Sequence, residues 1–375
     1  MKVLHVYSGN LFGGVETALI TLARERNLCP QMQPYFALCF EGRLATELRA
    51  TGVGVYMLGK VRVSQPWTVW KARRQLARIL KQEGFDVIIC HACWPQAMFA
   101  PVVRKNQLPL VFWCRDTPSG KHWLERWASQ TPPDFAIANS HYTRTAISNL
   151  YPGIRSGTLY NALVCPEIGS GADIRQTVRG ELNTPDDAIV IIHASRLERW
   201  KGHTLLLSAL GQLRDEKNWS CWMVGGAQRP HEAVYLQELQ AIARELGIAN
   251  RVQFLGQRAD VPRLLAAADI HCQPNTGAEP FGNVFVEALY AGLPVVTTAM
   301  GGGMEIVDES CGRLVAPDDA EGLSEVLRSL ITNSAQREKL AAQGPARAEQ
   351  LCNPARQLSR LHGLLSGLVK QEAVA

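Results

Sequence analysis

The sequence predicts two doubly wound α/β domains, and three observations lead to this prediction. The chain has 375 residues, which at roughly 150 residues per domain suits two globular domains. Short apolar runs alternate with longer amphipathic stretches, and this alternation occurs twice, as in parallel sheets covered by helices. The runs are apolar throughout, which is typical of strands buried on both faces.

Each half of the chain contains six such runs. In the first half we expect strands at Val3 to Tyr7, Tyr35 to Phe40, Gly54 to Leu58, Asp86 to Cys90, Leu110 to Trp113 and Phe135 to Ala138. In the second half we expect them at Ala188 to His193, Ser220 to Val224, Val252 to Leu255, Ile270 to Gln273, Pro294 to Thr297 and Gly312 to Val315. No run approaches the ~18 apolar residues of a membrane span.

The stretch from Tyr160 to Pro185 is rich in proline and glycine and has few large apolar residues, which is typical of an interdomain connection. We place the domain boundary near Glu167. The prediction is therefore an amino-terminal domain over 1–166, a carboxyl-terminal domain over 167–342 and a helical segment over 343–375. The pattern leaves open which domain this segment covers, and packing back onto the first is one option.

Composition excludes several classes of protein. The net charge of +5 is too mild to indicate nucleic acid binding, and ten cysteines spread over the chain are expected to be reduced. The first residues lack the pattern of a signal peptide, so we expect a cytoplasmic protein. The motifs of P-loop ATPases, zinc proteases and serine hydrolases are absent from the sequence.

A glycine-containing turn from Ser8 to Glu16 follows the first strand. Its glycines permit close approach of a ligand, and the next helix directs its amino terminus there, so the turn suits an anion. It is not a dinucleotide fingerprint, because Gly9 and Gly13 are four residues apart and no acidic residue ends the second strand.

The second half carries more specific signals. Arg196 and Lys201 follow the strand 188–193 and can close on a diphosphate from two sides, although a solvated basic loop is the alternative. Glu279 and Glu287 flank a glycine turn and the start of a helix, which places Glu279 in a loop and Glu287 one turn into the helix.

With these residues the chain resembles the family-4 retaining glycosyltransferases of the GT-B architecture over nearly its whole length. The resemblance rests on Gly13-Gly14-Val15-Glu16, Ser195-Arg196-Leu197-Glu198 with Lys201-Gly202, Phe254-Leu255-Gly256, Ala268-Asp269, the glutamate pair with Ala288-Leu289, and Gly292-Leu293-Pro294-Val295-Val296. It implies two Rossmann-like domains facing each other across a cleft and transfer with retention. The first domain, over 1–166, would bind a hydroxyl acceptor, and the second, over 167–342, would bind a nucleoside diphosphate sugar donor.

The resemblance also implies site residues. Arg196 and Lys201 would bind the donor diphosphate and neutralise its growing charge, and with Glu279 and His91 they are the candidate catalytic residues. The donor-binding set is Gly14, Arg196, Lys201, Gln257, Arg258, Glu279, Phe281, Gly282, Asn283, Val284 and Glu287, with Glu287 on the ribose and Gln257 and Arg258 near the base. UDP-sugar is favoured over GDP-sugar.

The candidate acceptor residues depart from the family pattern. They are Glu16, His91, Arg115 and Asp116, and Cys114-Arg115-Asp116 stands where many relatives have a histidine followed by aspartate. Arg115 or His91 can take the place of that histidine. His91 is either an acceptor-site residue or a residue that only packs in the core.

The sequence has no D-x-D element, so we expect metal-independent transfer without a cofactor. Two alternatives remain, a UDP-sugar epimerase of the same architecture and a non-catalytic protein that binds sugar nucleotides.

The stretch from Lys71 to Lys81 carries five cations and no acid, and Trp67 and Trp70 precede it. Such a helix suits peripheral contact with an anionic membrane and hence a lipid-linked acceptor; otherwise the acceptor is a saccharide. The alternative is a solvated helix whose apolar residues pack on the first sheet.

Overall fold

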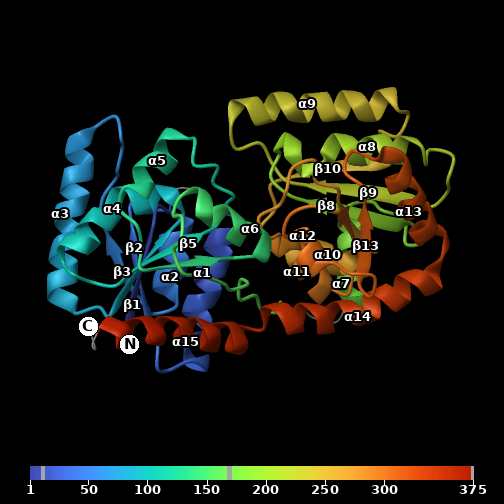
Figure 1. Ribbon diagram of the computed structural model, residues 1–375. Helices are drawn as coiled ribbons and strands as arrows, with labels where there is room; N and C mark the ends of the chain where they lie inside the picture. The colour runs from blue at the N-terminus through green and yellow to red at the C-terminus, as the bar shows by residue number, and fades with distance from the viewer. Residues whose placement is uncertain (10–12, 167–170, 373–375) are drawn as a thin grey trace. The chain divides into compact units, whose positions relative to one another are not determined.

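The computed structural model describes residues 1–9, 13–166 and 171–372, and it divides into two compact units. The first unit comprises Met1–Val164 and Cys352–Ala375, and the second comprises Cys165–Leu351. Each unit is a parallel sheet with helices on both faces (Figure 1). The predicted boundary at Glu167 and the centre of the glycine turn, residues 10–12, lie outside the described residues.

The first unit has a parallel sheet in the order β3-β2-β1-β4-β5-β6-β7. Its strands are β1 (Lys2–Tyr7), β2 (Gln33–Leu38), β3 (Gly54–Met57), β4 (Val87–His91), β5 (Leu110–Cys114), β6 (Phe135–Ala138) and β7 (Ser156–Thr158). Its helices are α1 (Gly14–Arg24), α2 (Arg43–Ala50), α3 (Pro66–Glu83), α4 (Cys93–Lys105), α5 (Trp123–Ser129), α6 (His141–Ala146) and α15 (Pro354–Glu372), with short 3₁₀ turns η1 (Glu25–Leu28) and η2 (Ile147–Asn149).

The second unit has a parallel sheet in the order β10-β9-β8-β11-β12-β13. Its strands are β8 (Ile189–Ala194), β9 (Trp219–Val224), β10 (Val252–Gly256), β11 (Ile270–Gln273), β12 (Val295–Thr298) and β13 (Gly312–Val315). Its helices are α7 (Gly171–Glu181), η3 (Arg199–Lys201), α8 (His203–Gly211), α9 (Pro230–Glu245), α10 (Val261–Ala267), α11 (Asn283–Tyr290), α12 (Gly303–Ile306), α13 (Ala320–Thr332) and α14 (Ser334–Cys352).

The two sheets reverse their strand order at equivalent places. In the first unit the reversal lies between β1 and β4, and in the second it lies between β8 and β11. At such a reversal the connections on the two sides leave in opposite directions, which opens a crevice at the carboxyl ends of the strands. The loops after these four strands are therefore where a ligand site is expected.

All twelve predicted strands are present, with bounds that differ from the prediction by at most two residues. Two expectations needed correction. The strand β7 was not predicted, because Ser156–Thr158 is short and lacks large apolar residues. The stretch predicted as an interdomain connection contains α7, whose Val178 and Arg179 are buried in the second unit.

The last helix, α15, packs on the first unit. Its buried leucines join the apolar cluster of that unit, which also contains residues of β1, β2 and α1 (Figure 1). They are Leu358, Leu361, Leu365 and Leu368, spaced three or four residues apart along one face of the helix. This spacing explains why the segment is a helix with one apolar face, whereas the sequence alone did not indicate which domain it covers.

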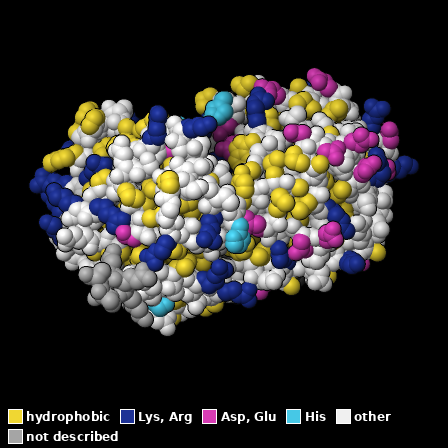
Figure 2. Space-filling view, viewed as in Figure 1, with side chains coloured by type: hydrophobic (Ala, Val, Ile, Leu, Met, Phe, Trp, Pro, Cys, Tyr) yellow, Lys and Arg dark blue, Asp and Glu magenta, His cyan; other side chains and the backbone are white. Residues whose placement is uncertain are grey.

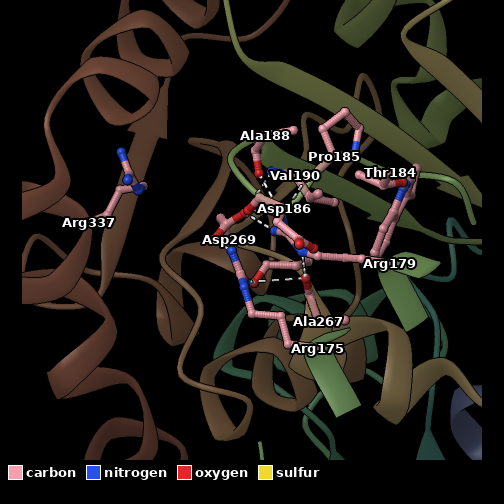
Figure 3. Close-up of polar contacts among 12 residues, drawn as sticks. Arg175, Arg179, Thr184, Pro185, Asp186, Ala188, Val190, Ala267, Asp269 and Arg337 are labelled. Carbon is pink, nitrogen blue, oxygen red and sulfur yellow. Dashed lines mark hydrogen bonds and ion pairs between the residues drawn. The ribbon is translucent and has the colours of Figure 1, made fainter. Parts of the chain in front are cut away.

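A buried ion pair joins α7 to the second sheet (Figure 3). The guanidinium of Arg179, whose side chain is 1% exposed, lies 2.7 Å from Asp269 Oδ2 and donates to the carbonyls of Ala267 and Ala188. Arg175, also on α7, lies 2.7 Å from the other oxygen of Asp269. Asp269 also accepts from the amide of Val190 at the start of β8. One carboxylate thus joins a helix to two strands.

No helix within 1–9, 13–166 and 171–372 combines the length and the apolar character needed to cross a bilayer.

Arg179→Met and Arg175→Met test this ion pair as a matched set, because both arginines bind the same carboxylate. Loss of the buried Arg179 leaves backbone carbonyls and part of the carboxylate unpaired, so we expect the free energy of unfolding to fall by about 3–5 kcal/mol. Loss of Arg175, which is 36% exposed, should lower it by about 1 kcal/mol or less. Urea unfolding followed by circular dichroism measures both, and equal losses would contradict the assignment.

Candidate functional site

In the second unit, a lysine and a glutamate meet beside the crevice between β8 and β11. Lys201 lies in η3, after β8, and Glu279 lies in the loop after β11. The Nζ atom of Lys201 lies 2.5 Å from Glu279 Oε2, and the two side chains are only 11% and 12% exposed. The structure therefore brings together two residues that the sequence placed 78 positions apart and predicted for the same site.

Two amides, which the sequence analysis missed, also hold Glu279. Gln273 Nε2 and Asn275 Nδ2 lie 3.5 Å and 3.4 Å from Glu279 Oε2, and Gln273 also donates to Asn275 Oδ1 at 3.0 Å. Both amide side chains are buried. The side-chain contacts that Glu279 makes with other described residues fall on Oε2, so Oε1 can accept a hydrogen bond from a ligand. No motif marks a neutral amide at the end of a strand, so only the fold reveals these two residues.

Close backbone packing fixes the two loops that carry the pair. Gly202 has a φ of +78°, and a Cβ atom there would lie 1.8 Å from the carbonyl oxygen of Pro274. Gly301 has a φ of +63°, and a Cβ atom there would lie 2.5 Å from the carbonyl oxygen of Glu279. Only glycine fits at either position, so the loops stay in contact and the ion pair is preorganised.

The helix α11 begins directly after this loop. Its N-cap, Gly282, has a φ of +99°, and the amides of Asn283 and Val284 open the helix, where an anion is favoured. Phe281 is buried. Glu287 lies one turn into the helix, half-buried, and burial raises the pKa of its carboxyl to about 7. The predicted placement of both glutamates relative to the helix is confirmed.

The other predicted donor residues are more exposed. Arg196, in the loop after β8, is 48% exposed and pairs with Glu198 at 3.0 Å. Gln257 is exposed after β10, and Arg258 forms an ion pair with Asp260 at 2.7 Å. Gly14 is exposed at the start of α1 in the first unit. Their contacts with a donor stay predictions.

In the first unit, a chain of buried side chains links β1, β4 and β5. His5 Nδ1 lies 2.9 Å from His91 Nε2, Arg115 Nη2 lies 3.2 Å from His91 Nδ1, and Arg115 Nη1 donates to Asn161 Oδ1 at 2.6 Å. Arginine is only a donor, so His91 Nδ1 accepts and the proton of His91 is on Nε2, which donates to His5. Burial lowers the pKa of His5 to about 3 and that of His91 well below its usual value.

This arrangement restricts what His91 can do. Its ring is fully buried and both nitrogens are hydrogen-bonded, so it is placed to orient Arg115. Its direct role in catalysis stays a prediction. His5 and Asn161 were not predicted, because a histidine inside a strand and an asparagine in a connecting loop give no signal in the sequence.

The remaining predicted acceptor residues lie around the same strand ends. Glu16, on α1, is buried and accepts the hydroxyl of Tyr7 at 2.6 Å. The ring of Tyr7 meets that of His91 edge to face. Asp116 is exposed directly after Arg115. The carboxyl ends of β1, β4 and β5 therefore gather the predicted acceptor residues, with Tyr7 as an addition.

Among the residues that the structure describes, no group of three or more histidine, cysteine, aspartate or glutamate side chains is arranged to hold a metal ion.

The family models cover both units. Residues 12–162 match the model described as Glycosyltransferase Family 4, and residues 174–347 match the one described as Glycosyl transferases group 1. The two Rossmann-like, parallel-sheet units have the architecture of the GT-B class of proteins. Within that class, the chain belongs to the family-4 glycosyltransferases.

Similar proteins include enzymes of lipopolysaccharide synthesis. The chain is 32% identical over 168 residues to the lipopolysaccharide core biosynthesis glycosyltransferase LpsE of Rhizobium meliloti. This match covers 44% of this chain and 46% of that protein. It is 43% identical over 103 residues to the lipopolysaccharide glucosyltransferase WaaG of Escherichia coli, which covers 27% of each. The matches therefore span about half the length of these relatives or less.

A solved structure matches over almost the whole chain. The crystal structure of Anabaena HepE in complex with UDP-glucose has a TM-score of 0.84 and 28% sequence identity, and the match covers 98% of this chain and 100% of that one.

Glu287→Gln tests the pKa of the buried carboxyl. Burial raises this pKa from 4.5 to about 7, so between these values the folded protein holds more protons than the unfolded one. The contribution of Glu287 to the free energy of unfolding should therefore fall as the pH rises from 4.5 to 7, and the difference between the variant and the natural protein isolates this contribution. At pH 8 the variant should be more stable by about 2–3 kcal/mol, and at pH 4 the two should be equal.

Urea unfolding at a series of pH values measures this difference. The exposed Glu309→Gln is the control and should track the natural protein at every pH. A difference between Glu287→Gln and the natural protein that does not change with pH would contradict the raised pKa.

Proposed function

We propose that the protein is a retaining, metal-independent glycosyltransferase that moves a sugar from a nucleoside diphosphate donor to a hydroxyl acceptor in glycan, glycolipid or polysaccharide synthesis. The observation that carries the proposal is the preorganised Lys201–Glu279 pair, which lies where the second sheet reverses its strand order. It presents a cation and a carboxylate oxygen side by side, as a sugar joined to a diphosphate requires.

In this proposal Lys201 binds the diphosphate of the donor, and Glu279 binds its sugar. The ammonium of Lys201 has three N–H groups, of which one is directed at Glu279, so two remain for oxygens of the diphosphate. Arg196 adds a second cation on the loop after β8. Both oppose the negative charge that grows on the diphosphate as the glycosidic bond breaks. Glu279 Oε1 accepts from a hydroxyl of the donor sugar, and Glu287 accepts from the ribose.

Retention follows from a substitution on one face of the sugar. The acceptor oxygen forms its bond to the anomeric carbon on the face from which the diphosphate departs, and a phosphate oxygen of the leaving group takes the acceptor proton. No protein nucleophile is needed for this step. Glu279 is a poor candidate for one, because Lys201, Gln273 and Asn275 all hold its Oε2 atom.

The donor is a UDP-sugar in this proposal, with GDP-sugar as the alternative. HepE, which is 28% identical, was solved with UDP-glucose, and this supports the choice. The base is placed at the backbone after Gly256, where the amide of Gly225 already binds the Gly256 carbonyl at 2.9 Å. Because main-chain groups would recognise the base there, side chains give no direct indication of its identity.

Nucleotide binding tests the proposal before an acceptor is known. With EDTA present, UDP or UDP-glucose should raise the midpoint of thermal unfolding by several degrees, because a ligand that binds only the folded state stabilises it. GDP, ADP, CDP and dTDP provide the comparison. Lys201→Ala and Glu287→Ala should abolish the rise, whereas Lys217→Ala, at an exposed position of the same unit, should retain it.

Two results would contradict this assignment. A rise that is the same in Lys201→Ala would place the nucleotide elsewhere, and a rise that disappears with EDTA would overturn metal independence. Binding without transfer to any hydroxyl acceptor would favour the non-catalytic alternative.

We further propose that α3 contacts an anionic membrane surface, with the protein on the cytoplasmic side and a lipid-linked acceptor. Trp67 and Trp70 are 58% and 59% exposed, and Lys71, Arg74 and Arg78 are exposed beside them. Figure 2 shows Lys and Arg side chains gathered over this helix at the left edge of the view. Tryptophans beside cations suit the boundary between lipid head groups and water.

One cation of this helix is not available to a membrane. Arg73 donates to the carbonyls of Met98 and Ala97 on α4 at 2.6 Å and 3.2 Å, and it is half-buried. It holds α3 to α4. A test of the surface must therefore leave Arg73 unchanged.

Sedimentation with vesicles of phosphatidylglycerol and phosphatidylcholine tests the membrane contact. The triple variant Lys71→Glu, Arg74→Glu and Arg78→Glu should lose at least tenfold in partitioning, because each cation near such a surface contributes about 1 kcal/mol. A charge-matched control changes three exposed cations of the second unit to glutamate, namely Lys217, Arg244 and Lys339. Equal losses in both variants would show that net charge, and not this helix, determines binding.

A further inference from the structure

Arg115 lies in surroundings that disfavour a positive charge. It follows β5, and only 5% of it is exposed. Its guanidinium donates to Asn161 Oδ1 and to His91 Nδ1, and it stacks on the ring of Trp113 at 4.1 Å from the ring centroid. All three partners are neutral, since the pKa of His91 lies well below its usual value. Neutral partners satisfy donors but do not compensate a buried charge.

No carboxylate of the described residues forms an ion pair with Arg115. Glu16 and Asp116 act on it only from a distance, and Glu16 Oε1 already accepts the hydroxyl of Tyr7. Even with these acidic groups nearby, burial lowers the pKa of Arg115 to about 9. The cation therefore lacks a counter-charge in contact.

Two other buried cations of the described residues show the contrast. Lys201 contacts Glu279, and Arg179 contacts Asp269. A buried charge without a partner is strongly unfavourable, so proteins pair such charges internally or place them where a ligand provides the opposite charge. Arg115 fits the second case.

Two unused donors accompany this charge. Arg115 Nε and Trp113 Nε1 are both buried and have no hydrogen-bond partner. Both residues line one cavity of the first unit, bounded by α1, the loop after β7 and α15, which lie side by side in Figure 1. Most of the rest of its lining is apolar, including Leu22, Leu358 and Leu361, and Tyr160, Asn161 and Gln357 are its other polar side chains.

The size of the cavity limits what enters it. Its open space is about 20 Å³, which is room for one water-sized atom. A whole sugar does not fit, but one oxygen of a carboxylate or phosphate group does. A water molecule would satisfy the two donors and still leave the charge of Arg115 uncompensated.

We propose that Arg115 and Trp113 form an anion-binding site that accepts one oxygen of a carboxylate or phosphate group. Arg115 Nε and Trp113 Nε1 donate to this oxygen, and the anion supplies the missing counter-charge. If the protein is the glycosyltransferase proposed above, the anionic group belongs to the acceptor, which is then an acidic or phosphorylated saccharide. The site itself lies wholly in the first unit and does not depend on that function.

Anion-dependent stability tests the site. The midpoint of thermal unfolding is measured against sodium phosphate and sodium acetate at constant ionic strength. In the natural protein, the midpoint of thermal unfolding should rise with the logarithm of the anion concentration once the site is half filled. Arg115→Met, which removes the charge and keeps much of the volume, should lose the rise. Arg73→Met, which removes a half-buried arginine of the same unit, should keep it.

Trp113→Phe provides a second variant that decides the question even if Arg115→Met does not fold. It removes the N–H donor and keeps an aromatic ring under Arg115. Loss of one hydrogen bond to a charged ligand should raise the apparent dissociation constant for the anion roughly tenfold. An unchanged dissociation constant in Trp113→Phe, or an equal rise in the natural protein and Arg115→Met, would overturn the site.

Two sources of the anion are then distinguished with glucose 6-phosphate and glucuronate against glucose, phosphate and acetate. If the group belongs to a saccharide acceptor, glucose 6-phosphate and glucuronate should raise the midpoint of thermal unfolding at concentrations at least tenfold below those of phosphate and acetate, and glucose should have no effect. If the sugar anions and the free anions need the same concentration, the site binds a free anion and the acceptor assignment is overturned. Anion binding in a protein that binds no nucleotide would contradict the proposed function alone.

Discussion

The order of the parallel strands is the constraint on which the rest of this structure depends. In both units the sheet reverses its direction of growth beside its first strand, between β1 and β4 and between β8 and β11. Helices then leave the two neighbouring strands on opposite faces, so the loops after them are not covered. Most side chains of the two candidate sites lie at the carboxyl ends of these strands or of an immediate neighbour, where residues from distant parts of the chain meet outside the sheet.

Charge compensation distinguishes the buried cations that this architecture creates. Asp269 neutralises Arg179 at the amino-terminal edge of the second sheet, where the pair is purely structural. Glu279 neutralises Lys201 at the opposite edge and keeps one oxygen available. Arg115 has only neutral partners. Arg179 is paired within the protein, Lys201 is paired but beside a free carboxylate oxygen, and Arg115 needs a ligand to supply its counter-charge. Internal pairing stabilises the fold, whereas an uncompensated charge suits ligand binding.

Much of the fold could be predicted because its causes are local. Strands buried on both faces must be apolar throughout, so the runs at Val3 to Tyr7 and Ile270 to Gln273 are visible without any knowledge of their neighbours. Edge strands and connecting helices are less visible. Ser156–Thr158 pairs along one side only, and α7 is recognised by what it buries and not by its composition.

The sequence by itself determined the architecture and indicated which charged residues of the second unit belong to its site. Both signals are local, because apolar runs mark the strands, and glycines, carboxylates and cations at fixed spacings mark the loops that follow them. Only the tertiary structure decided the partners. It placed Gln273 and Asn275 on Glu279, joined His5 to His91, and left Arg115 without a counter-ion. The reason is physical: hydrogen bonds and ion pairs act over a few ångströms, and which residues come that close depends on how the strands are ordered.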